Sequence, residues 1–146
     1  MLKNKNIIIK NILLSKVKKF SVPEGNVFHA VRKKDLGFDE FGEVYFSWIK
    51  YNKIKAWKKH KKATLNLLVP IGKVCFIFID NKKIYKKIII GQDYYNRITV
   101  PPGFWFGFKG ISKKQSLVMS LSNIMHNSKE TENCPVSSFD MIYSFK

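Results

Sequence analysis

The stretch LNLLVPIGKVCFIFIDNKKIYKKIIIG, residues 65–91, is dominated by Leu, Val, Ile and Phe and is interrupted by Gly72 and by the polar run that starts at Asp80. Short apolar runs rich in β-branched and aromatic residues, bounded by glycine or a polar turn, are typical of buried β-strands. The pattern predicts three strands, over residues 65–71, 73–80 and 86–91. The DNKK segment supplies a hairpin turn between the last two.

Upstream of this stretch, EVYFSWIKY (residues 43–51) alternates along its length. Successive side chains of a strand point to opposite faces, so one face carries Val44, Phe46 and Trp48. The opposite face carries Glu43, Tyr45 and Ser47. That second face is polar enough to line a cavity.

Downstream, RITVPPGFWFGF (residues 97–108) predicts a strand, a rigid Pro-Pro-Gly corner and an aromatic strand, and QSLVMSLSNI (residues 115–124) predicts one more strand. No segment has the pattern of a helix of a dozen residues. Eight or more short strands with Gly and Pro corners indicate a sandwich or barrel. We therefore expect one all-β domain spanning residues 1–146, with a jelly-roll architecture.

The chain is strongly basic, with 27 Lys and Arg against 10 Asp and Glu and a formal net charge of +17. Only Arg32 and Arg97 are arginines, whereas proteins that read phosphates and base edges favour the planar fork of arginine. Lysine spread along every segment indicates compositional bias, so we expect no nucleic-acid partner. The charge also fits a basic cleft for an anionic small molecule.

Two cysteines, Cys75 and Cys134, do not make a disulfide framework, which favours the reducing cytoplasm. The apolar pieces of residues 1–20 are interrupted by lysines every few residues. We therefore expect neither a signal peptide nor a membrane partner.

The stretch from Lys55 to Gly72 has the spacing of a cupin metal-binding motif without its ligands. The H-x-H pair of that motif falls on Lys58 and His60, and its later histidine, within PPGFWF, falls on Phe106. One imidazole does not provide the three or more protein ligands that such a metal site needs. We expect no metal.

From Glu43 onward the chain resembles the dTDP-4-dehydrorhamnose 3,5-epimerase family and the related nucleotide-sugar 3,4-ketoisomerases. EVYFS and KAWK match the family's Q-x-N-x-S strand and R-G-x-H turn, with Ser47 and Lys55 at the required spacing. VPPGFWFGF stands where the family has I-P-P-G-F-A-H-G-F. HNSKE matches the family's final Tyr-Pro-Glu landmark, with His126 in the tyrosine's place and Glu130 retained.

The resemblance implies a cupin-type fold, but several of the family's catalytic residues are replaced. Its base histidine aligns with Lys58, its enolate-stabilising lysine with Leu65, its tyrosine acid with His126 and its phosphate-binding arginine with Lys55. A rearranged site can be sketched in which His60 is the base, Lys58 supplies positive charge near the enolate and His126 returns the proton. A desolvated Lys58 is an alternative base.

The resemblance further implies a nucleotide-sugar ligand, an NDP-4-keto-6-deoxysugar, without a nicotinamide cofactor, and a homodimer. The candidate substrate-binding residues are Glu43, Tyr45, Ser47, Lys55, Trp57, Trp105 and Phe106. Two alternatives stay open: a non-catalytic cupin that binds a carbohydrate or nucleotide-sugar, and a basic nucleic-acid module. If the chain is a non-catalytic cupin, Lys58 and His60 would lie at the solvent-exposed start of a strand.

Overall fold

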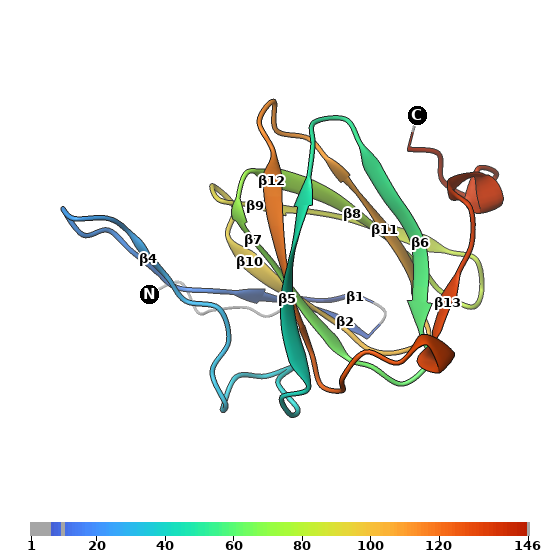
Figure 1. The fold of residues 1–146 in the computed structure, drawn as a ribbon, viewed down its shortest axis with the longest axis horizontal. Helices are drawn as coiled ribbons and strands as arrows, with labels where there is room; N and C mark the ends of the chain where they lie inside the picture. Colours follow the sequence, from blue (N-terminus) through green and yellow to red (C-terminus); the bar gives the residue numbers. More distant parts are fainter. Residues whose placement is uncertain (1–6, 10, 146) are drawn as a thin grey trace.

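The computed structural model describes residues 7–9 and 11–145, and two antiparallel β-sheets that face each other make up most of it (Figure 1). In spatial order, the six-stranded sheet contains β1 (Ile7–Ile9), β2 (Ile12–Lys16), β10 (Asn96–Val100), β7 (Leu65–Ile71), β12 (Ser116–Ser122) and β5 (Glu43–Ile49). The five-stranded sheet contains β13 (Thr131–Asn133), β6 (Ile54–His60), β11 (Trp105–Gly110), β8 (Lys73–Ile79) and β9 (Tyr85–Gly91).

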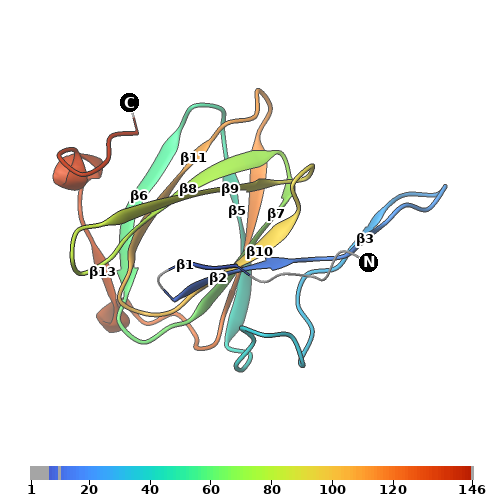
Figure 2. The same cartoon turned by 180° about the vertical axis from the view of Figure 1, so that it is seen from behind.

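The remaining elements are short. A two-stranded hairpin, β3 (Lys19–Phe20) and β4 (Val27–Phe28), extends away from the barrel, as Figure 2 shows from behind. Two 3-10 helices, η1 (Ser128–Glu130) and η2 (Val136–Phe139), belong to the C-terminal segment. No helix of the described residues is long and apolar enough to cross a membrane.

The strands predicted from residues 65–91 are confirmed as β7, β8 and β9. The hairpin turn between β8 and β9 is stabilised by Asp80, whose Oδ1 accepts hydrogen bonds from the backbone N–H groups of Lys82 and Ile84, each at 2.9 Å. An aspartate at the start of a turn commonly binds the following backbone in this way.

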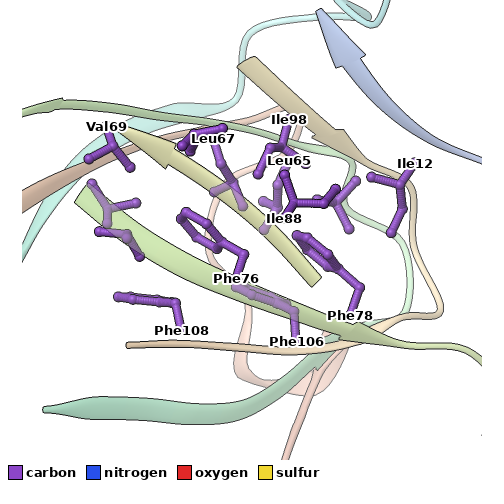
Figure 3. Packing of buried hydrophobic residues seen from close by; sticks show 14 of the residues in the cluster. Ile12, Leu65, Leu67, Val69, Phe76, Phe78, Ile88, Ile98, Phe106 and Phe108 are labelled. Carbon is purple, nitrogen blue, oxygen red and sulfur yellow. The ribbon is translucent and has the colours of Figure 1, made fainter. Parts of the chain in front are cut away.

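The hydrophobic core lies between the two sheets (Figure 3). The phenyl rings of Phe76 and Phe78 on β8 and of Phe106 and Phe108 on β11 pack inside the barrel. The opposing sheet contributes aliphatic side chains, among them Leu65, Leu67, Val69, Ile98 and Ile12. Burial of this apolar surface is the main stabilising term of the fold.

A second cluster covers the outer face of the five-stranded sheet. Cys75, Ile77 and Ile79 on β8 point outward and are buried, because Phe139 and Phe145 of the C-terminal segment pack over them. Both faces of β8 are therefore covered, which explains why its sequence is continuously apolar instead of alternating.

We predict that Phe76→Ala, which removes a fully buried ring, lowers the free energy of unfolding by about 4 kcal/mol. Ile84→Ala, at a side chain that is 47% exposed, serves as the control and should change it by less than about 1 kcal/mol. Urea denaturation of the three proteins measures both effects. Equal losses in the two variants would contradict this placement of the core.

Candidate active site

Two adjoining cavities open the interior of the barrel on the side of β5 and β6. Their volumes are about 370 and 290 Å³, and Tyr45 and Lys58 line both of them. The larger is bordered mainly by apolar side chains, including Phe106, Phe108 and Val118. The smaller is polar and is bordered by His60, His126 and Glu130, among others. Together they have the size and the mixed lining of a small-molecule site.

The polar face predicted for β5 does line these cavities. Glu43 and Tyr45 border the smaller one, and Tyr45 and Ser47 border the larger. The opposite face of β5 points away from the barrel and remains exposed, at 40% for Val44, 60% for Phe46 and 51% for Trp48.

An irregularity in β6 brings three of its basic side chains to the cavities. In the pairing with β11, Phe106 lies opposite Lys58 and Phe108 lies opposite Lys55, so two residues of β6 face one of β11. Such a β-bulge breaks the alternation of side chains. Lys55 and Lys58, three positions apart, consequently border the same cavity, and His60 follows two positions later.

His60 is held by a carboxylate from the C-terminal segment. Its Nδ1 makes a hydrogen bond with Oε1 of Glu130, which lies at the end of η1. The side chains are 11% and 6% exposed, respectively. The other carboxylate oxygen, Oε2, accepts hydrogen bonds from the backbone N–H groups of Lys61, Lys62 and Ala63 at 3.0–3.3 Å.

These contacts determine the ionisation of Glu130. Burial raises the pKa of this carboxyl group, but the hydrogen bond with His60 and those from the N–H groups of Lys62 and Ala63 outweigh it and leave the pKa below its ordinary value. Glu130 is therefore ionised at neutral pH. An ionised carboxylate only accepts hydrogen bonds, so Nδ1 of His60 is the donor of this pair.

The tautomer fixed in this way leaves a lone pair on the opposite ring nitrogen of neutral His60. The Nε2 atom is buried and has no hydrogen-bond partner. The imidazole stacks against Phe106, with ring centroids 6.1 Å apart and planes inclined by 20°. His60 borders the polar cavity, and Nε2 is the ring nitrogen left to accept a proton from a ligand there.

The other two candidate catalytic residues border the same polar cavity. Lys58 is half-buried, and no described residue makes a hydrogen bond or ion pair with its Nζ. His126 comes from the loop after β12 and is exposed. The structure thus brings His60, Lys58 and His126 to one place, with His126 on the solvent side.

Lys55 is tied to the neighbouring strand at the entrance of the larger cavity. Its Nζ donates to Oγ of Ser47 at 2.7 Å and to the backbone oxygen of Trp48 at 2.8 Å. An ammonium group has three donors, so one stays available for an anionic ligand.

The structure does not bring the two candidate tryptophans into the barrel. The indole of Trp57 packs in the outer cluster, 5.3 Å from the ring of Phe139, and its Nε1 donates to the backbone oxygen of Val136 at 2.9 Å. Trp105 also packs against Phe139, at 5.6 Å, and lies beneath the ammonium group of Lys59. Trp57 is nevertheless among the residues that border the larger cavity, whereas Trp105 borders neither cavity.

Glu130, Asn133 and Cys134 are among the residues at the site that were not singled out from the sequence. Glu130 matched a family landmark, but no role for it followed from the motif. Asn133 and Cys134 border the larger cavity because β13 pairs with the cavity-lining strand β6. Among residues 7–9 and 11–145, no group of three or more His, Cys, Asp or Glu side chains could hold a metal ion.

No protein-family model matches this sequence, and a search of curated proteins gives no match. Solved structures do match. A dTDP sugar isomerase from Desulfovibrio desulfuricans is 28% identical, with a TM-score of 0.89 and coverage of 94% of this chain and 92% of the other.

Two further structures share the fold at lower identity. The dTDP-4-dehydrorhamnose 3,5-epimerase of Elizabethkingia anophelis is 14% identical, with a TM-score of 0.80 and coverage of 97% and 86%. A sugar 3,4-ketoisomerase from Thermoanaerobacterium thermosaccharolyticum, in complex with TDP, is 18% identical, with a TM-score of 0.75 and coverage of 92% and 96%. The expected all-β cupin-type fold and the resemblance to these epimerases and ketoisomerases are confirmed.

We predict that Glu130→Gln lowers the free energy of unfolding by about 3 kcal/mol at pH 7, because it removes the buried negative charge that binds His60 and three N–H groups. A carboxyl group with a lowered pKa stabilises the fold above its unfolded-state pKa, and this contribution is lost as the pH falls through the folded-state value. The difference from the wild type should therefore shrink in acid.

Urea denaturation at pH 7 and at a pH below about 4, where the carboxyl group is protonated in the unfolded chain, measures this dependence. Glu132→Gln, which removes a carboxylate that is 41% exposed and pairs with Lys59, is the matched control. It should change the unfolding free energy by less than about 1 kcal/mol at either pH. The assigned role of this carboxylate would be contradicted if Glu130→Gln lowered the free energy of unfolding only slightly, or by the same amount at both pH values.

Proposed function

We propose that this chain is a metal-independent epimerase or isomerase of a nucleoside-diphosphate 4-keto-6-deoxysugar. The observation that carries the proposal is the His60–Glu130 pair at the polar cavity, which leaves the Nε2 of His60 without a hydrogen-bond partner. The likeness to a dTDP sugar isomerase, at 28% identity over nearly the whole chain, supports the substrate class.

The first step is removal of a proton from the carbon next to the 4-keto group. His60 Nε2 takes this proton, and the electron pair of the C–H bond becomes the enolate. Lys58 contributes positive charge beside the enolate oxygen, where it stabilises the developing anion. Return of a proton to the same carbon from the opposite face, by His126, completes an epimerisation.

The remainder of the ligand occupies the larger cavity. The free donor of the Lys55 ammonium group contacts the diphosphate, as a point charge in the place of the family's arginine. Phe106 provides an apolar wall, and the hydroxyl of Tyr45, to which no described residue hydrogen-bonds, is available to the sugar. Glu43 and Ser47 complete the polar side of the site.

The protein acts as a homodimer in the cytoplasm, in the synthesis of deoxysugars for surface polysaccharides. Support for the dimer comes from β5, which is the last strand of its sheet and exposes Val44, Phe46 and Trp48. An edge strand with an apolar outer face favours pairing with a second copy.

The alternative to an enzyme is a non-catalytic cupin that binds the same ligand class, since Leu65 stands at the position of the family's enolate-stabilising lysine.

We predict that the protein catalyses deuterium incorporation at C3 or C5 of dTDP-4-keto-6-deoxyglucose in heavy water. Proton NMR measures this exchange as the loss of the H3 or H5 signal. His60→Ala should slow the exchange at least about 100-fold, because it removes the base. Lys58→Ala should slow it as well, through loss of the charge beside the enolate.

Lys59→Ala is the matched control, because Lys59 lies on the same strand but its ammonium group is over Trp105, outside the barrel. It should retain wild-type exchange. Binding of the nucleotide-sugar without exchange in the wild type would select the non-catalytic alternative. Absence of binding would contradict both.

We also predict that replacing Phe46 and Trp48 together by lysine converts a dimer into a monomer, because the added charges oppose burial of this face. Light scattering should give twice 17.1 kDa for the wild type and 17.1 kDa for the variant. Ile84→Lys, at an equally exposed apolar side chain outside β5, should stay dimeric. A wild type that is monomeric at micromolar concentration would contradict the dimer.

A further inference from the structure

A cavity of about 180 Å³ lies on the outer face of the six-stranded sheet, between that face and the segment that follows β4. β2 and β10 form its floor. Their neighbouring residues Leu14 and Ile98 belong to the core inside the barrel, whereas Ser15 and Arg97 point the other way. The cavity is therefore separated from the candidate active site by the thickness of the sheet.

The floor of this cavity presents two hydrogen-bond donors without acceptors. Ser15 and Arg97 are paired across β2 and β10 and are 5% and 3% exposed. Neither the Oγ of Ser15 nor the Nε of Arg97 has a hydrogen-bond partner. Buried donors of this kind are costly unless a bound group accepts from them.

The rest of the Arg97 guanidinium group is fixed by the segment that covers the cavity. Its Nη1 donates to the backbone oxygen of Ala30 at 3.0 Å and to Oδ2 of Asp35 at 3.2 Å, and its Nη2 donates to the backbone oxygen of Leu36 at 2.9 Å. The Nε–H is consequently held in a preformed orientation at the cavity.

The walls of the cavity carry an excess of positive charge. The residues that border it include Lys16, Lys18, Arg32 and Arg97, against one carboxylate, that of Asp35. Asp35 is already bound by Arg32 at 2.9 Å and by Arg97 at 3.2 Å. No described residue pairs with the ammonium groups of Lys16 and Lys18.

We infer that this cavity binds a phosphate group, either inorganic phosphate or the phosphate of a small monoester. The oxygens of one phosphate accept from Ser15 Oγ and Arg97 Nε, and the two lysines and Arg32 balance its double negative charge. A neutral ligand would satisfy the two donors but would leave the positive charge uncompensated. The site does not depend on the sugar-nucleotide reaction proposed for the barrel.

Isothermal titration calorimetry with potassium phosphate and with glycerol 3-phosphate, at constant ionic strength in chloride, tests this site. We expect saturable one-to-one binding by the wild type. Lys16→Ala combined with Lys18→Ala should weaken it roughly tenfold or more. Ser15→Ala, which loses no hydrogen bond of the folded protein, should also weaken it. The tighter of the two probes identifies the natural source, and either order supports the site.

Two controls keep the test specific. The Lys33→Ala and Lys34→Ala pair removes the same amount of charge from the segment that follows β4, at two residues that do not line the cavity, and this variant should bind phosphate as the wild type does. Lys55→Ala alters only the barrel entrance, and this variant should also bind phosphate at this cavity as the wild type does. The site would be overturned if the wild type showed no saturable phosphate binding. It would also be overturned if the Lys33 and Lys34 pair weakened phosphate binding as much as the Lys16 and Lys18 pair, or if only Lys55→Ala abolished it. Acetate that binds as tightly as phosphate would overturn the choice of ligand.

Discussion

The carboxylate of Glu130 is the group on which the geometry of the candidate active site depends. It is buried, ionised and fully engaged, with one oxygen on His60 and the other on three successive backbone N–H groups of the turn that follows β6. A single side chain thus fixes the end of β6, the position of η1 and the tautomer of the imidazole. Without it, no described carboxylate would assign the ring proton of neutral His60 to Nδ1.

The barrel can accommodate this polar site because its interior is divided. Phenylalanine rings of β8 and β11 and aliphatic side chains of β7, β9 and β10 fill one part of it, which supplies the stability of the fold. The part near β5 and β6 is left open and is lined by the alternate, polar residues of these strands. Phe106 belongs to both parts, because it packs on Phe78 and stacks on His60.

Much of this could be predicted from the sequence, because strands buried on one face alternate and strands buried on both do not. The alternation of β5 and the apolar run of β8 are clear examples. The same rule places Trp57 opposite to Lys58, and Trp105 opposite to Phe106. Assigning Trp105 to the cavity was wrong, and Trp57 borders the larger cavity although its indole packs in the outer cluster. The side-chain alternation alone does not put Lys55 on the same face as Lys58, because that placement depends on a bulge; the family resemblance is what assigned Lys55 to the site. The contact between Glu130 and His60 was beyond prediction, because it joins residues 70 positions apart.

The most direct test of the central claim is the protonation pattern of His60, observed by nitrogen-15 NMR of the imidazole ring with and without the nucleotide-sugar dTDP-4-keto-6-deoxyglucose. The neutral ring is predicted to carry its proton on Nδ1, to keep Nε2 unprotonated, and to show a change at Nε2 when the sugar of this nucleotide enters the barrel. In Glu130→Gln the preference for this tautomer should weaken. A neutral ring protonated on Nε2, or an Nε2 signal unaffected by the nucleotide, would contradict the role of His60 as a base held by Glu130.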